Sequence, residues 1–237
     1  MYMALKYRNE LKFMINYHQY FTIRQRLKAL MKRDQHAGPD GEYHIRSLYF
    51  DDIGNKALDE KLGGVSDRIK YRIRIYNMED KVIHFEKKIK RNEYIAKVKE
   101  SLTRSMVDEL LHGNIEVMNV PDKPLFAELY DEMKHRLLRP KVIVDYVREP
   151  YVCANGNVRI TFDKELRSGL SSTDLFDGEL GAVRALDENF IILEVKYDEY
   201  LPGYIRDALQ LEGLQRQSAS KYVICRKFIK MNSWEDQ

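Results

Sequence analysis

Four stretches of this sequence alternate charged and apolar residues in a pattern suited to holding a polyanion. Each is typical of a β-strand, where successive side chains point to opposite faces, so each has a charged and an apolar face. In residues 70–76, KYRIRIY, the charged face carries Lys70, Arg72 and Arg74. The other charged faces carry Arg8, Glu10 and Lys12 in 7–13, His84, Glu86, Lys88 and Lys90 in 84–90, and Glu194 and Lys196 in 191–197.

The cations of these faces are suited to phosphate. Arg offers a planar fork to two phosphate oxygens and Lys offers a point charge, so several of them at fixed spacing can grip a chain of phosphates. We expect Lys12, Arg72, Arg74 and Lys88 to meet in one anion site. The alternative for each of them alone is a solvated surface cation.

Three glutamates lie two residues before a lysine on the same face: Glu10, Glu86 and Glu194. Mg²⁺ and Mn²⁺ commonly use one or two carboxylates together with phosphate oxygens and waters, which makes these glutamates candidate metal ligands. Each of them could instead only pair with a neighbouring cation. For Glu194 the metal is favoured, because its strand is the most apolar and an unpaired charge there is costly.

Further candidates come from the second half of the chain. Lys221, in the segment SASKY, falls in the first turn of an expected helix, where free backbone N–H groups and the helix dipole favour anions. A plain serine cap with a solvated lysine is the alternative there. Tyr146 and Arg148 share a strand face, and Arg159 follows a turn; both arginines could also be surface residues.

The overall composition excludes several classes of protein. The 40 Lys and Arg nearly balance the 37 Asp and Glu, so we expect no DNA-coating protein, and any anion site must arise from local arrangement. No GxxxxGK[ST], HExxH or GxSxG motif is present. Cys153 and Cys225 suggest no disulfide framework, which fits a reducing cytoplasm. No signal-peptide core and no run of about 20 apolar residues appears, so we expect a soluble protein without a membrane segment.

The elements that must position these residues are strands followed by helical segments. Strands are expected at about 6–14, 42–52, 67–77, 81–90, 140–152, 157–166 and 190–200. Helices are expected at about 17–31, 103–113, 123–138, 202–213 and from 221 onward. Short hairpins and polar stripes on most strands predict an α+β fold, a closed antiparallel barrel of about eight strands with a cationic lumen and helices outside. We expect one domain over 1–237, with a helical insertion at about 101–139 and C-terminal helices at about 202–230.

An ordered series of motifs resembles one known family. RNELKF, RSLYFDD, KYRIRIY, FEKKIK, DYVREPY, VRITFD, LEVKY and SASKY follow one another from about residue 6 to 230. This series is similar to the VTC domain, the catalytic module of polyphosphate polymerases within the triphosphate tunnel metalloenzymes. Each motif alone is weak, whereas the ordered series is specific.

The resemblance implies a reaction and assigns residues to it. It implies transfer of the γ-phosphate of ATP to a growing polyphosphate chain, with Mn²⁺ or Mg²⁺ as cofactor and ATP and polyphosphate as partners. The implied catalytic residues are Arg72, Arg74, Lys88 and Glu194, of which Glu194 binds the metal. The implied phosphate contacts are Lys12, Arg46, Arg72, Arg74, Lys88, Tyr146, Arg148, Arg159, Ser220 and Lys221.

One departure within the tunnel superfamily favours the polymerase branch. The adenylate-cyclase and thiamine-triphosphatase branch begins with ExExK, whereas this chain has RNELK, so Arg8 replaces one metal carboxylate. The eukaryotic polymerases also carry an SPX sensor and membrane helices, which are not expected here, so the chain resembles a stand-alone bacterial type. The sequence leaves open a triphosphate hydrolase of the same fold and a non-catalytic barrel that binds polyphosphate or RNA. It does not indicate an oligomeric state.

Overall fold

The fold is a closed antiparallel β-barrel with helices around it, which confirms the fold expected from the sequence. The computed structural model describes residues 5–210 and 213–232. Around the barrel the order is β7, β3, β4, β5, β6, β1, β10 and β8, and β8 pairs with β7 to close the sheet. These strands are β1 (Arg8–Asn16), β3 (Tyr43–Asp51), β4 (Arg68–Tyr76), β5 (Glu79–Arg91), β6 (Tyr94–Leu102), β7 (Arg139–Cys153), β8 (Val158–Ser168) and β10 (Phe190–Tyr197). Two short strands, β2 (Lys32–Arg33) and β9 (Val183–Arg184), pair with β7 and β8.

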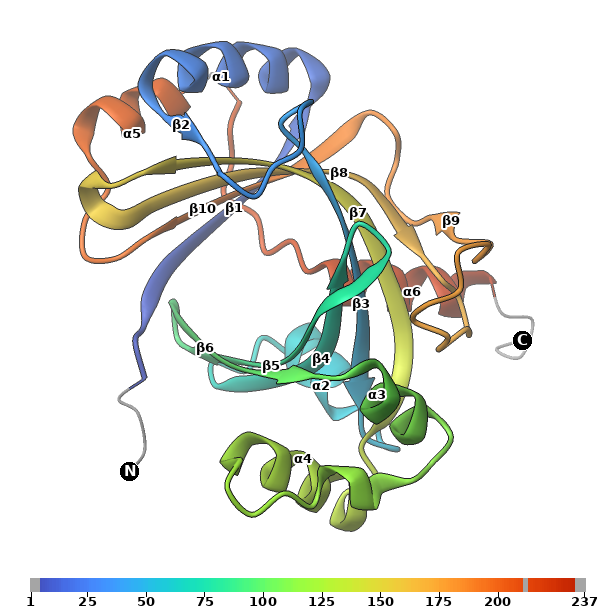
Figure 1. Ribbon diagram of the computed structural model, residues 1–237. Coiled ribbons are helices and arrows are strands. Elements are labelled where there is room, and N and C mark those ends of the chain that lie inside the picture. Colours follow the sequence, from blue (N-terminus) through green and yellow to red (C-terminus); the bar gives the residue numbers. More distant parts are fainter. Residues whose placement is uncertain (1–4, 211–212, 233–237) are drawn as a thin grey trace.

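Two groups of helices cover opposite sides of the barrel (Figure 1). Helices α1 (Tyr17–Leu30) and α5 (Gly203–Leu209) lie over β1, β8 and β10. Helices α3 (Arg104–Leu111) and α4 (Pro124–His135), with the 3₁₀ turn η1 (Ile115–Met118), cover β4 and β5. The remaining helical elements are α2 (Lys56–Leu62), the turn η2 (Asn155–Asn157) and α6 (Lys221–Asn232). Helix α1 starts sharply because Asn16 and Gln19 form a capping box.

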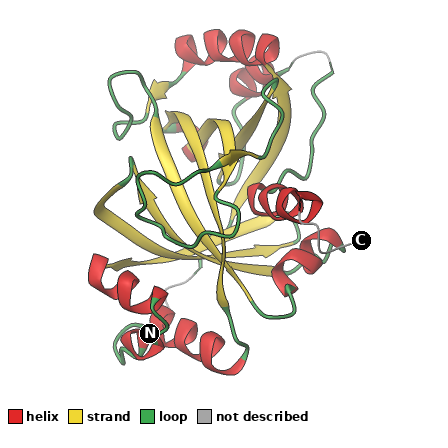
Figure 2. Cartoon of the chain, turned by 90° about the vertical axis from the view of Figure 1, so that its right-hand side faces the viewer, coloured by secondary structure: helices red, strands yellow, loops and turns green. Residues whose placement is uncertain are grey.

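Two of the three apolar clusters lie outside the barrel wall, between the strands and the covering helices. Ile73 of β4 is buried in one apolar cluster with Phe126 of α4, and Val195 of β10 is buried in another with Ile23 of α1. Because side chains alternate along a strand, this outward apolar face turns the charged face of each strand toward the lumen. Figure 2 shows the strands enclosed by helices from a second direction.

The C-terminal helix α6 packs against the inner face of the barrel rather than its outside. Its buried Tyr222 and Cys225 belong to one apolar cluster with Tyr49, Tyr146 and Ile192, which point inward from β3, β7 and β10. Helix α6 therefore fills part of the lumen with apolar side chains, and its N-terminus faces the charged remainder.

One seam of the barrel is short. Strand β1 pairs with β6 only through Arg8 and Asn9. Further along β1, the segment 214–220, here called the strap, runs beside the strand: the Gln217 N–H donates to the Lys12 carbonyl at 2.8 Å, and Arg216 pairs with Phe13. The strap thus completes the wall where β6 does not reach.

The structure differs from the sequence expectations in several elements. The short strands β2 and β9 were not expected, and α6 packs against the inner face of the barrel although the helices were expected outside it. Strand β6, which was not expected, pairs with β5 along its whole length. The last barrel strand ends at Tyr197, three residues earlier than expected. Helix α5 ends at Leu209, and residues 211–212 of the expected helix lie outside the described residues. No helix in the described ranges has both the length and the apolar character needed to cross a membrane.

Candidate active site in the barrel lumen

A cavity of about 390 Å³ occupies the charged part of the lumen. Among the described residues that line it, twelve are Lys or Arg and three are Glu, so the cavity is strongly cationic. The cations are Lys12, Lys61, Arg68, Lys70, Arg72, Arg74, Lys88, Lys90, Arg148, Lys196, Arg216 and Lys221. They come from strands on all sides of the barrel, from α2, from the strap and from α6, which suits the cavity to an extended anion.

Glu194 is the most heavily compensated carboxylate of the cavity. Its Oε1 lies 2.9 Å from the Lys221 ammonium and 3.1 Å from that of Lys12. Its Oε2 lies 3.0 Å from Lys196 and 3.5 Å from Arg148. Burial alone raises the pKa of the Glu194 carboxyl, but these four cations outweigh burial and hold it well below its usual range. Glu194 is therefore ionised and holds four cations around one point.

Glu10 lies next to Glu194 and shares cations with it. Its carboxylate is 3.0 Å from Lys12, 2.9 Å from Lys88 and 3.8 Å from Lys196. Burial by itself raises the pKa of the Glu10 carboxyl. The three lysines together lower this pKa by more, so the net shift is downward. Lys12 and Lys196 thus bridge two ionised carboxylates on neighbouring strands.

Arg72 and Arg74 project from β4 into the lumen with different partners. The Arg72 guanidinium lies 2.5 Å from Glu86 and donates to the Tyr49 hydroxyl at 2.7 Å. The Arg74 guanidinium donates to the hydroxyls of Ser47 and Tyr146, each at 3.0 Å. Arg74 has no carboxylate within salt-bridge distance among the described residues, so its charge is available to an anion.

Arg148 and Lys221 hold a further carboxylate that the sequence did not single out as a site residue. The Arg148 guanidinium binds Asp163 in a two-pronged pair, at 2.6 and 2.7 Å. The Lys221 ammonium also contacts Asp163. Burial raises the pKa of Asp163, but Arg148 and Lys221 lower it more strongly. Asp163 therefore fixes two of the expected phosphate contacts in place.

Four cations at one end of the cavity have no carboxylate partner among the described residues: Lys61, Arg68, Lys70 and Lys90. The Lys70 ammonium donates to the Ser220 hydroxyl at 3.1 Å, and that hydroxyl is its hydrogen-bond acceptor in the described structure. Burial, together with the nearby cations, lowers the pKa of Lys70 well below its usual range. We call this group the cationic end of the lumen.

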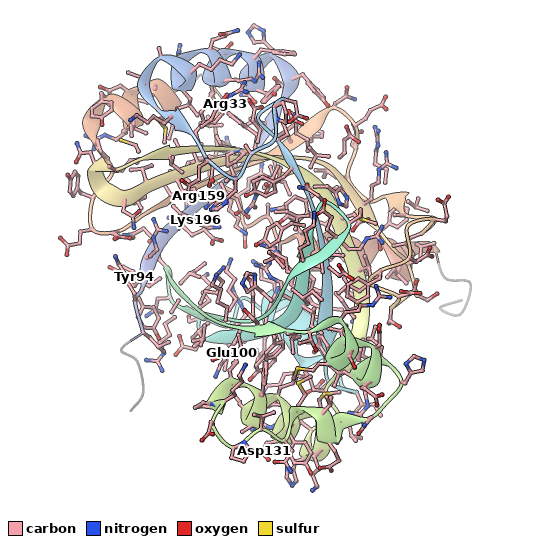
Figure 3. The ribbon with its side chains drawn as sticks, in the orientation of Figure 1. Arg33, Tyr94, Glu100, Asp131, Arg159 and Lys196 are labelled. Carbon is pink, nitrogen blue, oxygen red and sulfur yellow. The ribbon has the colours of Figure 1, made fainter. Side chains whose placement is uncertain are left out.

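Three expected site residues lie outside the cavity: Arg46, Arg159 and Glu86. Arg46 was expected to contact phosphate, but it points to the outer face of β3, where it pairs with Asp145 at 2.9 Å. The expectation that Arg46 contacts phosphate was wrong. Arg46 is the register partner of Asp145 and both face outward, whereas the next residue, Ser47, lies opposite Arg74 and faces the lumen. Arg159 faces inward next to Lys196 (Figure 3), but its guanidinium is held by Asp34 at 2.8 Å and by the Tyr43 hydroxyl at 2.9 Å.

The other expected residues lie together. The cavity lining includes Glu10, Lys12, Arg72, Arg74, Lys88, Tyr146, Arg148, Glu194, Ser220 and Lys221. The lining also includes Tyr49, Lys61, Arg68 and Arg216, which were not expected from the sequence, and Lys70, Lys90 and Lys196, which belong to the charged strand faces. Lys61 and Arg216 come from α2 and the strap, where no strand alternation marks them.

Glu10 and Glu194 fit a divalent metal, whereas Glu86 does not. The two carboxylates lie in the lumen, joined by shared lysines and beside the expected phosphate contacts. Glu86 is outside the cavity, and its two oxygens are held by Arg72 and by Lys97 at 2.8 Å. In the described ranges no three His, Cys, Asp or Glu side chains form a complete metal site. Oxygens of a bound phosphate chain would therefore have to complete the coordination of Mg²⁺ or Mn²⁺.

Comparison with solved structures gives the same architecture at low sequence identity. A putative adenylyl cyclase from Hippeastrum, HpAC1, described as having a dominant triphosphatase activity, matches with a TM-score of 0.52 and 13% identity over 93% of this chain and 95% of that one. A putative adenylate cyclase from Bacillus halodurans matches with a TM-score of 0.49 and 13% identity over 82% of each chain. Among the curated proteins, none matches this sequence.

The family comparison covers nearly the whole sequence. The model of the VTC domain matches residues 7–230, which include every barrel strand and the strap. The closed eight-stranded barrel around the cationic cavity is the triphosphate tunnel architecture expected from the resemblance. The chain belongs to the VTC domain family.

Proposed function

We propose that this protein is a metal-dependent polyphosphate polymerase that transfers the γ-phosphate of ATP to a growing polyphosphate chain inside the barrel. The observation that carries the proposal is the cavity itself, in which cations from all sides surround the adjacent carboxylates of Glu10 and Glu194. Cations at this density suit a ligand with many phosphates, and two carboxylates suit the metal that accompanies a nucleotide triphosphate.

In the proposed reaction the protein mainly positions the phosphate groups and neutralises their negative charge. An oxygen of the terminal phosphate of the acceptor chain forms a bond to the γ-phosphorus of ATP. The bond between that phosphorus and the β,γ-bridging oxygen breaks, and ADP leaves with the electron pair. The acceptor oxygen is already deprotonated, so no side chain needs to remove a proton. Arg72, Arg74 and Lys88 are positioned to hold the oxygens of the transferring group.

A divalent metal, when bound, neutralises charge on phosphate oxygens. Glu194 and Glu10 are the residues that would hold it. Lys12 and Lys196 each contact both carboxylates, and their ammonium groups would be free to turn toward the phosphate chain once Glu10 and Glu194 hold a metal. Mg²⁺ and Mn²⁺ both suit such a site. We assign the reaction to the cytoplasm, where the free thiols Cys153 and Cys225 would persist and ATP is abundant.

Hydrolysis of triphosphates is the second candidate, because the Hippeastrum protein of similar architecture is described as a triphosphatase. In that reaction water takes the place of the acceptor chain. Arg8 favours the polymerase: it stands where the hydrolase branch has a carboxylate, and its guanidinium lies 2.7 Å from Asp198. The lumen therefore has one candidate metal carboxylate fewer at this position.

The test is to incubate the purified protein with ATP and Mn²⁺ or Mg²⁺, then to resolve polyphosphate on a gel and assay free phosphate. We expect long polyphosphate that gains one phosphate unit for each ADP released, and no product after EDTA. Free phosphate as the only product would support the hydrolase instead. Tight polyphosphate binding without turnover would support a non-catalytic binding barrel.

A further inference from the structure

The lumen has two chemically different ends. Along the inner face of β4 the order is Arg68, Lys70, Arg72, Arg74 and Tyr76. Toward Arg68 this face is cationic, and toward Tyr76 it ends in an aromatic ring. Neighbouring strands repeat this asymmetry. On β5, Lys90 lies at the cationic end and Lys88 lies opposite Lys70, whereas His84 lies opposite Arg74 in the register.

Three rings gather beyond Arg74. The Tyr76 ring lies 5.9 Å from that of Tyr43, which points inward from β3, and 6.5 Å from that of His84. Tyr76 and His84 are half-buried, so both keep ring surface open to a ligand. The Tyr43 hydroxyl accepts a hydrogen bond from Arg159. We call Tyr43, Tyr76 and His84 the aromatic end of the lumen; these rings lie beyond the lining of the cationic cavity, on the same inner faces of β3, β4 and β5.

His84 has an unused polar atom at this end. Its Nε2 lies 3.4 Å from the Lys99 ammonium, which can only donate, so we assign the ring proton to Nδ1. Nδ1 is buried and has no hydrogen-bond partner among the described residues. A buried donor without an acceptor is costly, and an oxygen or ring nitrogen of a ligand would satisfy it.

We propose that the aromatic end holds the base of the nucleotide, with Tyr76 as its stacking surface, so that the phosphates of ATP point toward the cationic end. This inference rests on the proposed function and adds an orientation and a base-binding residue to it. Successive inward residues on a strand are about 7 Å apart, so Tyr76 lies about one ribose beyond a phosphate held by Arg74.

The chemistry of the two ends supports this direction. Every nucleobase has a π-face that stacks on aromatic rings, whereas inorganic phosphate chains offer only charge. Tyr76 and His84 therefore distinguish a nucleotide from a bare phosphate chain. Lys61, Lys70 and Lys90 suit the part of the ligand that carries phosphate alone.

The test compares ATP with tripolyphosphate, which has the phosphates without the base, by calorimetric binding in Mg²⁺. We expect Tyr76→Ala to weaken ATP about tenfold and to leave tripolyphosphate within about twofold, because stacking is lost and the phosphate grip remains. Tyr76→Phe, which keeps the ring, should bind both ligands like the wild type. The matched control is Tyr94→Ala (Figure 3), since Tyr94 is an exposed tyrosine on β6 whose register partner Arg91 lies seven residues from His84 along β5.

The outcomes separate this inference from the proposed function. Equal weakening of ATP and tripolyphosphate by Tyr76→Ala, or no change in either, would overturn the base site while leaving the phosphate site in place. Selective loss of ATP binding in Tyr94→Ala would put the base at the opposite side and also overturn it. If Tyr76→Ala does not fold, His84→Ala takes its place, with the same selective loss expected and the same results counting against it. Wild-type protein that binds neither ligand contradicts both proposals.

Discussion

The ammonium of Lys221 lies 2.9 Å from the carboxylate of Glu194, which joins the first residue of α6 to the middle of β10. This pair connects the helix that fills part of the lumen to the carboxylate proposed to hold the metal. Removing the charge of Glu194 therefore tests the metal site and the integrity of the lumen together.

Glu194→Gln should keep the fold and most nucleotide binding, because the amide retains the shape and the surrounding cations remain. Turnover should fall strongly, since the amide removes the negative charge that would hold the metal. Raised Mn²⁺ should recover part of the loss in an assay of polyphosphate formation. Glu165→Gln, on the exposed outer side of β8, is the control and should behave like the wild type. Normal turnover of Glu194→Gln at low metal would mean that Glu194 only balances its four cations.

Arg72→Ala and Arg74→Ala should each reduce turnover at least tenfold, because a lost charged contact to phosphate is worth ~1.5–3 kcal/mol. The fold should survive in both, since the apolar neighbours Ile73 and Ile75 stay packed on the outer face. Circular dichroism and steady-state kinetics measure the two effects. Arg184→Ala removes an arginine from the surface strand β9 and should leave turnover unchanged. Two fully active lumen variants would show that β4 does not grip the substrate.

Lys70→Met should raise the melting temperature of the ligand-free protein and weaken tripolyphosphate binding. The ammonium contacts the Ser220 hydroxyl and lies 4.8 Å from the centre of the Tyr222 ring, but it has no carboxylate partner among the described residues, so its charge opposes folding until an anion arrives. Thermal melts with and without tripolyphosphate measure both changes. Lys81→Met, at an exposed lysine of β5, should change neither. A lower melting temperature in Lys70→Met would mean that the cationic end is compensated without a ligand.

Tripolyphosphate affinity should fall several-fold as the pH rises through about 8. Two lysines have a pKa lowered to about 8: Lys88, by burial and by repulsion from Lys12 and Lys196 against the pull of Glu10, and Lys97, by burial and by repulsion from Arg72 and Arg74 against the pull of Glu86. Above that pH Lys97 is neutral and no longer offsets the charge of Glu86. The carboxylate of Glu86 then offsets more of the positive charge of Arg72, which leaves less of that charge for the phosphates. The effect on stability has the opposite direction. Between about pH 8 and 10.5, Lys97 is protonated in the unfolded chain but not in the folded protein, so the free energy of unfolding rises with pH in this range.

Lys97→Arg provides the control for this pH dependence, because a guanidinium stays protonated throughout the range. Its tripolyphosphate affinity should change less between pH 7 and 9 than that of the wild type. Identical pH profiles for the two proteins would assign the loss of affinity to another group.

The alternation of residue types was enough to predict the barrel wall. In KYRIRIY, charged and apolar residues differ so strongly that only one face can be buried under helices, and Ile73 and Ile75 are indeed fully buried there. The same contrast in 7–13 and 191–197 set Glu10, Lys12, Glu194 and Lys196 on a common face. Because a strand has a side-chain period of two, such patterns fix the face of every residue along it.

Where both faces of a strand are buried, the sequence could not show which face points into the lumen. Strand β3 has large residues on both sides, so nothing in RSLYFDD showed that Arg46 points outward; its pairing with Asp145 on β7 decided it. Strand β6 mixes the strand-favouring Tyr94, Ile95 and Val98 with Ala, Lys and Glu, which are depleted in strands, and its pairing with β5 decided its structure.

The contacts between distant segments came only from the tertiary structure. The sequence placed Lys221 at a helix start and Glu194 on a strand, but their contact depends on α6 packing inside the barrel. The asymmetry between the cationic and aromatic ends arises in the same way, since it needs the register of β3, β4 and β5 together with α2. A sequence determines which face of a strand is polar because that depends on local geometry. Which polar groups meet depends on register and closure, which the whole barrel sets at once.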